Sequence, residues 1–200
     1  MSKVKICGLS RTEDITAVND ALPDYIGFVF ARSRRQVDGK TAAALRDRLD
    51  HRIKTVGVFV NGEIETVAGL YQSGAIDLAQ LHGDEDDGYI ATLKKVCGCP
   101  VVKAVGVGDS LPRFPGNADY LLFDTLSAER GGTGKAFDWR VLHAYNGPPY
   151  FLAGGLNAGN IPGALRSLTP YCIDVSSGAE TGGVKDPDKI LQIVSLVREV

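Results

Sequence analysis

Eight short apolar stretches, most of them rich in β-branched residues, recur along this 200-residue chain at intervals of roughly 20 to 30 residues. Such stretches are typical of strands that are buried on both faces of a sheet. Nothing in the composition between them marks a linker, so we expect residues 1–200 to form a single domain. The predicted strands are Val4–Cys7, Tyr25–Phe30, Thr55–Val60, Ile76–Leu81, Val101–Val107, Tyr120–Phe123, Tyr150–Leu152 and Cys172–Val175.

Helical patterns fill most of the intervals between these strands. Asp186–Pro187 predicts an N-cap and first residue for the last helix of the chain. Asn160 is expected to cap the helix that begins directly after it, at Ile161. Between Val107 and Tyr120, glycines and prolines leave no room for a regular helix, so the fifth helix should be short or missing. The i, i+3, i+4, i+7 spacing of an amphipathic helix occurs at Ile64, Val67, Ala68 and Tyr71, and at Ile190, Ile193, Val194 and Val197.

Eight strands joined by crossover connections predict a parallel sheet in an α/β fold. Eight is also the number of strands that closes such a sheet into a (β/α)₈ TIM barrel, which we therefore predict. The structural alternative is a doubly wound open sheet. That fold would need fewer strands or a protected edge, and its final helix would not return the chain to the first strand.

The bulk composition limits the classes of partner. A hydrophobic content of 44% and a charged content of 23% are ordinary for a globular protein, and a net charge of −2 gives no electrostatic reason to expect nucleic acid or an anionic membrane. No apolar run approaches the roughly 20 residues that span a bilayer. The apolar part of residues 1–9 is too short for a signal peptide. We expect a soluble, cytoplasmic protein without nucleic-acid or membrane partners.

The four cysteines do not predict a metal site or a disulfide framework. Cys97 and Cys99 lack a second Cys or His pair nearby that would complete a zinc site. Cys172 opens an apolar stretch and is most simply a core residue. We therefore expect no metal.

Residues that could take part in catalysis or ligand binding follow directly after the ends of the predicted strands. In a (β/α)₈ barrel these ends meet at one rim, where barrel enzymes have their active sites, so we expect a functional site there. The residues concerned are Cys7, Arg32, Arg34, Arg35, His82, Asp84, Glu85, Asp124, Gly154–Gly155 and Ser176–Gly178.

Three glycine-containing segments suggest an anionic ligand. Asp124 is followed by the loop 131–134, whose backbone N–H groups could face an anion, although the carboxylate could instead cap a turn. Segments 153–157 and 176–180 follow strands seven and eight, the usual phosphate position in such barrels, and they contain no Lys or Arg. Phosphate would then be bound by backbone amides and a helix N-terminus, unless the glycines merely allow tight turns.

Several other side chains have two interpretations. Cys7 is either a core residue or a base, and as a base it would need nearby N–H dipoles or a cation to ionise near neutral pH. His82 either binds substrate or hydrogen-bonds a loop. An arginine of the 32–35 segment that points inward would offer a bidentate contact to a carboxylate.

A family resemblance emerges from motifs that follow one another in order from residue 3 to about residue 191. They are Lys5–Leu9, Gly27–Phe30, Ser33–Arg35, Gln80–Glu85, Asp124, Gly131–Gly134, Phe137–Trp139, Ala153–Leu156, Asp174–Gly178 and Gly183–Asp186. With these motifs the chain resembles the phosphoribosylanthranilate isomerases of tryptophan biosynthesis. The resemblance implies a cofactor-free and metal-free barrel that acts on a small phosphorylated substrate, as a monomer or a homodimer.

The implied reaction is an Amadori rearrangement of N-(5′-phosphoribosyl)anthranilate to 1-(2-carboxyphenylamino)-1-deoxyribulose 5-phosphate. By the resemblance, Asp124 is the general acid that opens the furanose ring, Cys7 is the general base that removes the C2′ proton, and Arg35 binds the anthranilate carboxylate. His82 is a further candidate substrate contact. The residues expected around the phosphate are Gly132, Gly134, Gly154, Gly155, Ser177 and Gly178.

The chain departs from the family pattern at one position, and two other functions compete with the one that the resemblance implies. The family commonly has a proline where this chain has Arg34, which makes Arg34 a candidate second carboxylate contact, and the role of Asp174 is open. The related histidine-pathway isomerase uses a pair of carboxylates and has a phosphate loop in each half, whereas this chain has Cys7 and no such glycine loop at residues 60–63. A non-catalytic barrel that binds a sugar phosphate would have no reason to retain both Cys7 and Asp124.

Overall fold

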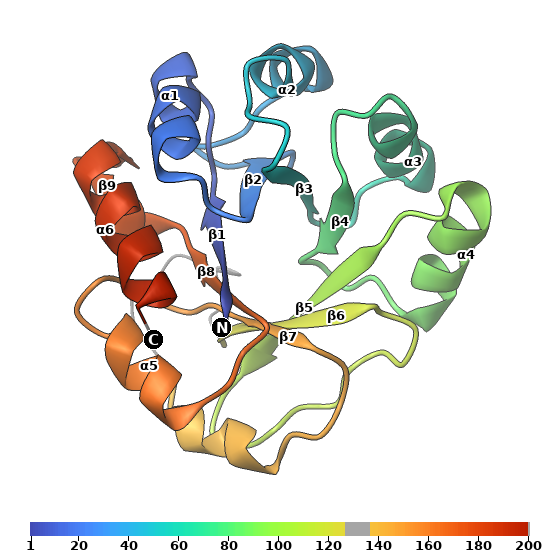
Figure 1. Ribbon diagram of the computed structural model, residues 1–200. Helices are drawn as coiled ribbons and strands as arrows, with labels where there is room; N and C mark the ends of the chain where they lie inside the picture. The colour runs from blue at the N-terminus through green and yellow to red at the C-terminus, as the bar shows by residue number, and fades with distance from the viewer. Residues whose placement is uncertain (127–136, 200) are drawn as a thin grey trace.

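A closed barrel of eight parallel strands, paired in sequential order, forms the centre of the molecule (Figure 1). The computed structural model describes residues 1–126 and 137–199. The barrel prediction is confirmed, and the open-sheet alternative is wrong because β8 pairs directly with β1. The strands are β1 (Lys3–Cys7), β2 (Tyr25–Val29), β3 (Lys54–Phe59), β4 (Leu78–Leu81), β5 (Val101–Val107), β6 (Tyr120–Thr125), β7 (Tyr150–Leu152) and β8 (Cys172–Val175).

The α-helices lie around the outside of the barrel (Figure 1). No helix forms in residues 108–119 between β5 and β6, so the expected absence of the fifth helix is confirmed. The described residues between β6 and β7 contain only a short 3₁₀ helix, η1 (Trp139–Ala144), which the sequence did not predict. The α-helices are α1 (Thr12–Ala21), α2 (Gly39–Arg46), α3 (Ile64–Gln72), α4 (Asp87–Cys97), α5 (Ile161–Ser167) and α6 (Pro187–Arg198).

The two predicted helix starts have different outcomes. The Asp186 side chain accepts hydrogen bonds from the backbone N–H groups of Asp188 and Lys189, as expected for the N-cap of α6. Asn160 precedes α5, but its side chain makes no capping bond. It accepts from the N–H of Asn157 at 2.9 Å and donates to the carbonyl of Gly155 at 3.0 Å. The predicted cap therefore fastens the loop after β7 instead.

Alternation along the strands divides the core into two layers. Val4 and Ile6 of β1 belong to the large apolar cluster between barrel and helices. A smaller cluster fills the barrel with side chains such as Val102, Leu122 and Phe151. Lys5, between Val4 and Ile6, is completely buried. Its bonds to residues of β4 and β8 place it inside the barrel.

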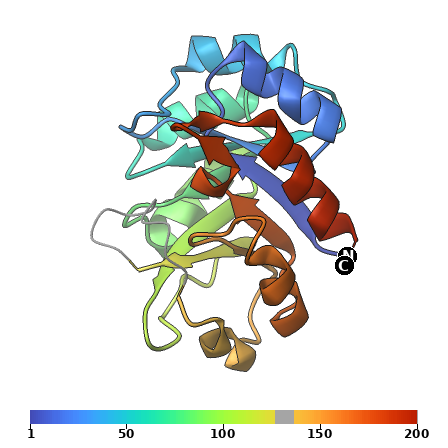
Figure 2. The ribbon, with the colours of Figure 1, turned by 90° about the vertical axis from the view of Figure 1, so that its left-hand side faces the viewer.

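The chain adds a small feature between β8 and α6 that the sequence did not predict. A 3₁₀ turn, η2 (Ser177–Ala179), leads into a two-stranded antiparallel hairpin of β9 (Glu180–Thr181) and β10 (Val184–Lys185). In both views the two termini lie close together, at the end of the barrel where the strands begin (Figures 1 and 2). Within residues 1–126 and 137–199, no helix is long and apolar enough to cross a membrane.

Candidate active site

The two proposed proton-transfer residues are on different strands at the C-terminal rim. Cys7 is the last residue of β1, and Asp124 lies in β6. The sequence placed Asp124 just after its strand, but β6 continues through Thr125 because pairing with β5 extends to Val107. In the closed barrel, β7 and β8 separate β6 from β1. The two side chains therefore approach the rim from different sides.

The Cys7 thiol is buried and lies close to the neighbouring strand. Cys7 pairs with Gly27 of β2, and a methyl group on Gly27 would lie 2.7 Å from the Cys7 sulfur. Burial raises the pKa of the Cys7 thiol, while the ammonium groups of Lys5 and Lys185 oppose that rise by favouring the thiolate. The sequence predicted that a base at this position would need nearby N–H dipoles or a cation, and the structure places two lysines beside the thiol.

Lys5 is a site residue that sequence reasoning missed. Its Nζ donates to Gln80 Oε1 at 2.8 Å and to Asp174 Oδ2 at 2.9 Å. Burial alone would lower the pKa of Lys5, but Asp174 and Cys7 outweigh it and raise that pKa above its ordinary value. Asp174 thus supplies the counter-charge of a buried cation beside Cys7. The signal in the sequence was a lysine between two core residues of a buried strand.

Asp124 lies in a polar corner formed by β4, β6 and the loop after β7. Its Oδ1 accepts from the backbone N–H of Thr125 at 2.7 Å, and its Oδ2 lies 3.5 Å from His82 Nε2. His82 Nδ1 is 3.1 Å from Gln80 Nε2. A methyl group on Gly154 would lie 3.3 Å from Asp124 Oδ1, so this loop packs directly against the carboxylate.

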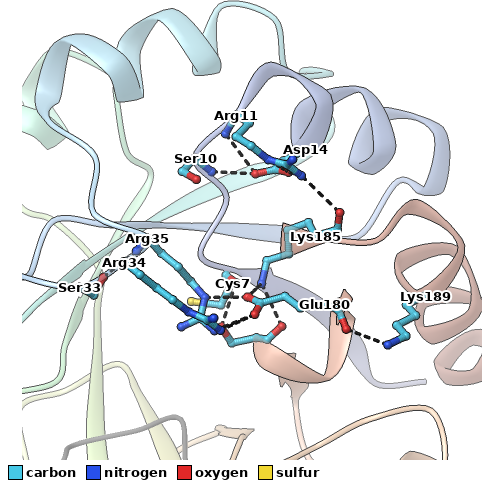
Figure 3. A network of polar contacts seen from close by, with 11 residues as sticks. Cys7, Ser10, Arg11, Asp14, Ser33, Arg34, Arg35, Glu180, Lys185 and Lys189 are labelled. Atoms are coloured by element: carbon cyan, nitrogen blue, oxygen red, sulfur yellow. Dashed lines mark hydrogen bonds and ion pairs between the residues drawn. The ribbon is translucent and has the colours of Figure 1, made fainter. Parts of the chain in front are cut away.

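Glu180, which sequence reasoning also missed, forms ion pairs with three basic side chains beside Cys7 (Figure 3). Its carboxylate accepts from Arg35 Nε at 2.6 Å and Nη2 at 3.0 Å, from Arg34 Nη2 at 2.6 Å and from Lys185 Nζ at 2.8 Å. Burial opposes the charge on Glu180, but the hydrogen bonds from Arg35 and Lys185 keep its pKa below the usual value. Burial lowers the pKa of Lys185 despite this partner. The cluster is locally cationic.

Arg35 lies over the start of the loop that follows β1. A methyl group on Gly8, the residue after Cys7, would overlap with the Arg35 side chain. Arg35 is therefore the arginine that reaches the rim beside Cys7, whereas Arg34 is largely exposed and Arg32 is exposed.

The two loops predicted to bind phosphate contact each other. A methyl group on Gly178 would lie 3.0 Å from Asn157 Cα, so the segment after β8, which contains Ser177, packs against the loop that begins with Gly154 and Gly155. Ser176 Oγ donates to the Cys7 carbonyl at 3.1 Å, which joins this pair of loops to β1. Two further predicted phosphate residues, Gly132 and Gly134, lie outside the described residues.

Two other rim carboxylates, Glu85 and Asp84, differ in their surroundings. Glu85 is buried and accepts from the N–H groups of Asn61 and Gly83 and from Lys103 Nζ, which fastens neighbouring loops together. Asp84 is exposed. In the part of the chain that the structure describes, no group of three or more His, Cys, Asp or Glu side chains could hold a metal ion.

Comparisons with known proteins agree with one another. A sequence model described as N-(5′-phosphoribosyl)anthranilate (PRA) isomerase matches residues 4–196. The N-(5′-phosphoribosyl)anthranilate isomerase of Endomicrobium trichonymphae is 51% identical over 201 residues and is covered, like this chain, to 100%. The crystal structure of phosphoribosyl anthranilate isomerase from Thermotoga maritima has a TM-score of 0.87 at 31% identity, with 100% of both chains covered. A phosphoribosyl anthranilate isomerase in complex with reduced 1-(o-carboxyphenylamino)-1-deoxyribulose 5-phosphate has a TM-score of 0.85 at 29% identity, again with 100% of both chains covered.

Proposed function

The chain belongs to the N-(5′-phosphoribosyl)anthranilate isomerase family, and on that premise we propose that it catalyses the Amadori rearrangement of this aminoaldose in tryptophan biosynthesis. The product is the aminoketose 1-(2-carboxyphenylamino)-1-deoxyribulose 5-phosphate, whose reduced form occupies a solved member of the family. The reaction is an aldose–ketose isomerisation that moves protons within one molecule, and we propose that no cofactor takes part.

Two proton transfers open the ring and form the enolamine that precedes the ketone. Asp124 gives its proton to the furanose ring oxygen, the C1′–O bond breaks, and the anthranilate nitrogen lone pair forms a Schiff base. The Cys7 thiolate then removes the C2′ proton, which gives an enolamine that tautomerises to the ketone. The observation that carries this proposal is the placement of the buried thiol and the carboxylate on β1 and β6 of one rim, because acid and base must approach different sides of one sugar.

The surroundings of each residue support its proposed role. Burial raises the pKa of Cys7 above its ordinary value, and Lys5 and Lys185 oppose that rise by favouring the thiolate that the base needs. The N–H of Thr125 and the His82 ring would stabilise the Asp124 carboxylate once its proton has left.

The proposed substrate contacts follow the same rim. Arg35, aligned by Glu180, has N–H groups left over for the anthranilate carboxylate. The contacting loops around Gly155 and Gly178 have backbone amides for the phosphate. A direct contact between His82 and the substrate stays a prediction. An active monomer or homodimer and a cytoplasmic location stay predictions.

The test follows the loss of anthranilate fluorescence after enzyme is added to freshly generated N-(5′-phosphoribosyl)anthranilate. We expect rapid loss with wild type and a rate at least about a hundredfold lower for Cys7→Ser and for Asp124→Asn, the usual scale for removal of a general acid or base. Cys97→Ser and Asp20→Asn change the same residue types on surrounding helices and should keep the wild-type rate.

Other outcomes would point to the competing functions. Turnover of the two-phosphate substrate of the histidine pathway in preference to this one would support the related isomerase. A folded wild type that turns over neither substrate but binds a sugar phosphate would support a non-catalytic sensor. Wild-type rates in both Cys7→Ser and Asp124→Asn would overturn the proposed roles while leaving the reaction itself in place.

A further inference from the structure

A chain of polar contacts runs from the buried side chains of Lys5 and Gln80 to the partly exposed side chains of His82 and Asp124. From it we infer that Gln80, oriented by Lys5, fixes His82 as the neutral tautomer with its proton on Nε2, which then donates to Asp124. Gln80 is thus a positioning residue that acts through His82. The effect on catalysis through Asp124 rests on the proposed function, whereas the tautomer of His82 does not depend on it.

The orientation of the Gln80 amide follows from its neighbour. A lysine ammonium can only donate hydrogen bonds, so the Gln80 atom that lies 2.8 Å from Lys5 Nζ must be the carbonyl oxygen. Lys5 is held in place because it is completely buried and also forms a 2.9 Å ion pair with Asp174. The amide nitrogen of Gln80, which can only donate, is then the atom 3.1 Å from His82 Nδ1.

The protonation pattern of His82 follows in turn. Because Gln80 presents a donor, His82 Nδ1 must be an acceptor, and a neutral imidazole with a bare Nδ1 carries its proton on Nε2. Nε2 lies 3.5 Å from Asp124 Oδ2. Such contacts are often long in a ligand-free site and shorten when substrate binds.

This arrangement gives Asp124 a fixed neutral donor. When Asp124 has released its proton, the carboxylate finds the N–H of Thr125 on one oxygen and the N–H of His82 on the other. A histidine with the opposite tautomer would place a lone pair against that carboxylate and repel it. We therefore expect the Gln80–His82 contact to affect kcat more than KM.

The direct test is the nitrogen NMR spectrum of the histidine rings in the free protein, at a pH where they are neutral. The chain has three histidines, so assignment by His51→Gln and His143→Gln is simple. We expect a single tautomer for His82 with an unprotonated Nδ1, whereas His51, 93% exposed, should show the averaged signal of two exchanging tautomers. A protonated Nδ1 or an averaged signal at His82 would overturn the inference.

The matched variant is Gln80→Glu, which keeps the size of the side chain and an oxygen for Lys5 but presents an acceptor to His82. We expect His82 Nδ1 to become protonated and kcat to fall about tenfold or more, the scale of one lost hydrogen bond to a charged group, with KM little changed. Gln72→Glu, at an exposed position of α3, is the control and should change neither readout.

The outcomes separate this inference from the proposed function. If His82 Nδ1 stays unprotonated in Gln80→Glu and kcat stays at the wild-type value, Gln80 does not set the tautomer and the inference is overturned. If wild type does not turn over the proposed substrate, the isomerase assignment fails, but the NMR measurement still decides whether Gln80 orients His82.

Discussion

The sulfur of Cys7 lies against the backbone of Gly27 on the neighbouring strand, so close that a methyl group on this glycine would be 2.7 Å from Sγ. The two residues are paired in the β1–β2 register. A bulkier residue on β2 would therefore displace the thiol, whatever its effect on the fold. This close approach makes the position of the proposed base sensitive to a residue that has no chemistry of its own.

We predict that Gly27→Ala lowers kcat at least tenfold, because the added methyl group displaces the Cys7 thiol from the proton it should remove. Steady-state kinetics of the anthranilate fluorescence change would measure the effect. Gly69→Ala on α3 is the control, since a methyl group there meets nothing within 4 Å. It should keep full activity and stabilise the protein by about 0.5–1 kcal/mol. Unchanged kcat in Gly27→Ala would show that the position of the thiol is not critical.

We expect Gly154→Ala to impair the Asp124 side of the site. Gly154 has φ +84°, and a methyl group there would lie 2.6 Å from Thr125 Oγ1 and 3.3 Å from Asp124 Oδ1. The backbone strain costs about 1–2 kcal/mol, and relief of the overlap would shift the carboxylate. Thermal unfolding should show a modest loss of stability, and kinetics should show a larger fall in kcat. Gly74→Ala has φ +76° and no atom within 4 Å, so it should reproduce the strain but not the loss of activity.

Removal of the Glu180 charge should destabilise the protein strongly. Glu180 and Lys185 side chains are 4% and 2% exposed, so Glu180→Gln leaves a buried ammonium without a counter-charge. We expect a loss of about 3–5 kcal/mol in the free energy of unfolding, measured with urea. Arg34→Ala removes another partner of Glu180, but the Arg34 side chain is 57% exposed, so it should cost about 1 kcal/mol or less. Equal losses in the two variants would contradict this account.

Stability should fall at alkaline pH because buried thiols resist ionisation in the folded chain. Burial raises the pKa of Cys99 to about 12, and it also raises the pKa values of Cys7 and Cys172. In the unfolded chain a thiol ionises near pH 8.5, so above that pH the unfolded state binds fewer protons and is favoured. The stabilising contribution is complete below about pH 8.5 and is lost progressively as the pH rises toward the folded pKa.

Urea unfolding at pH 7.5 and 9.5 would measure this effect, which amounts to about 1.4 kcal/mol for each thiol that stays protonated one pH unit above its unfolded pKa. The variant Cys99→Ala should be less stable at both pH values because it leaves a cavity, but its stability should depend less on pH. A free energy of unfolding that stays constant or rises between the two pH values would contradict the assignment of raised thiol pKa values.

The strands were predictable because their signal is local. Val101–Val107, Tyr150–Leu152 and Cys172–Val175 are strands with the predicted bounds, since a strand buried on both faces must be apolar throughout. The missing fifth helix was predictable for a similar reason, because prolines and glycines prevent helical hydrogen bonding wherever they lie. Asn160 shows the limit of such local prediction, because its side chain hydrogen-bonds to the preceding loop and not to the helix that follows.

The amino-acid order by itself thus determined the strands, the barrel and the identity of the rim residues, because each depends on periodicity and on the common direction of parallel strands. Only the tertiary structure decided the environment of Cys7 and Asp124. Glu180 reaches Arg35 across 145 positions through an unpredicted hairpin, and Lys5 meets Gln80 across 75. Pairings of buried charges depend on which side chains the closed barrel brings together, and short-range sequence patterns contain no information about that.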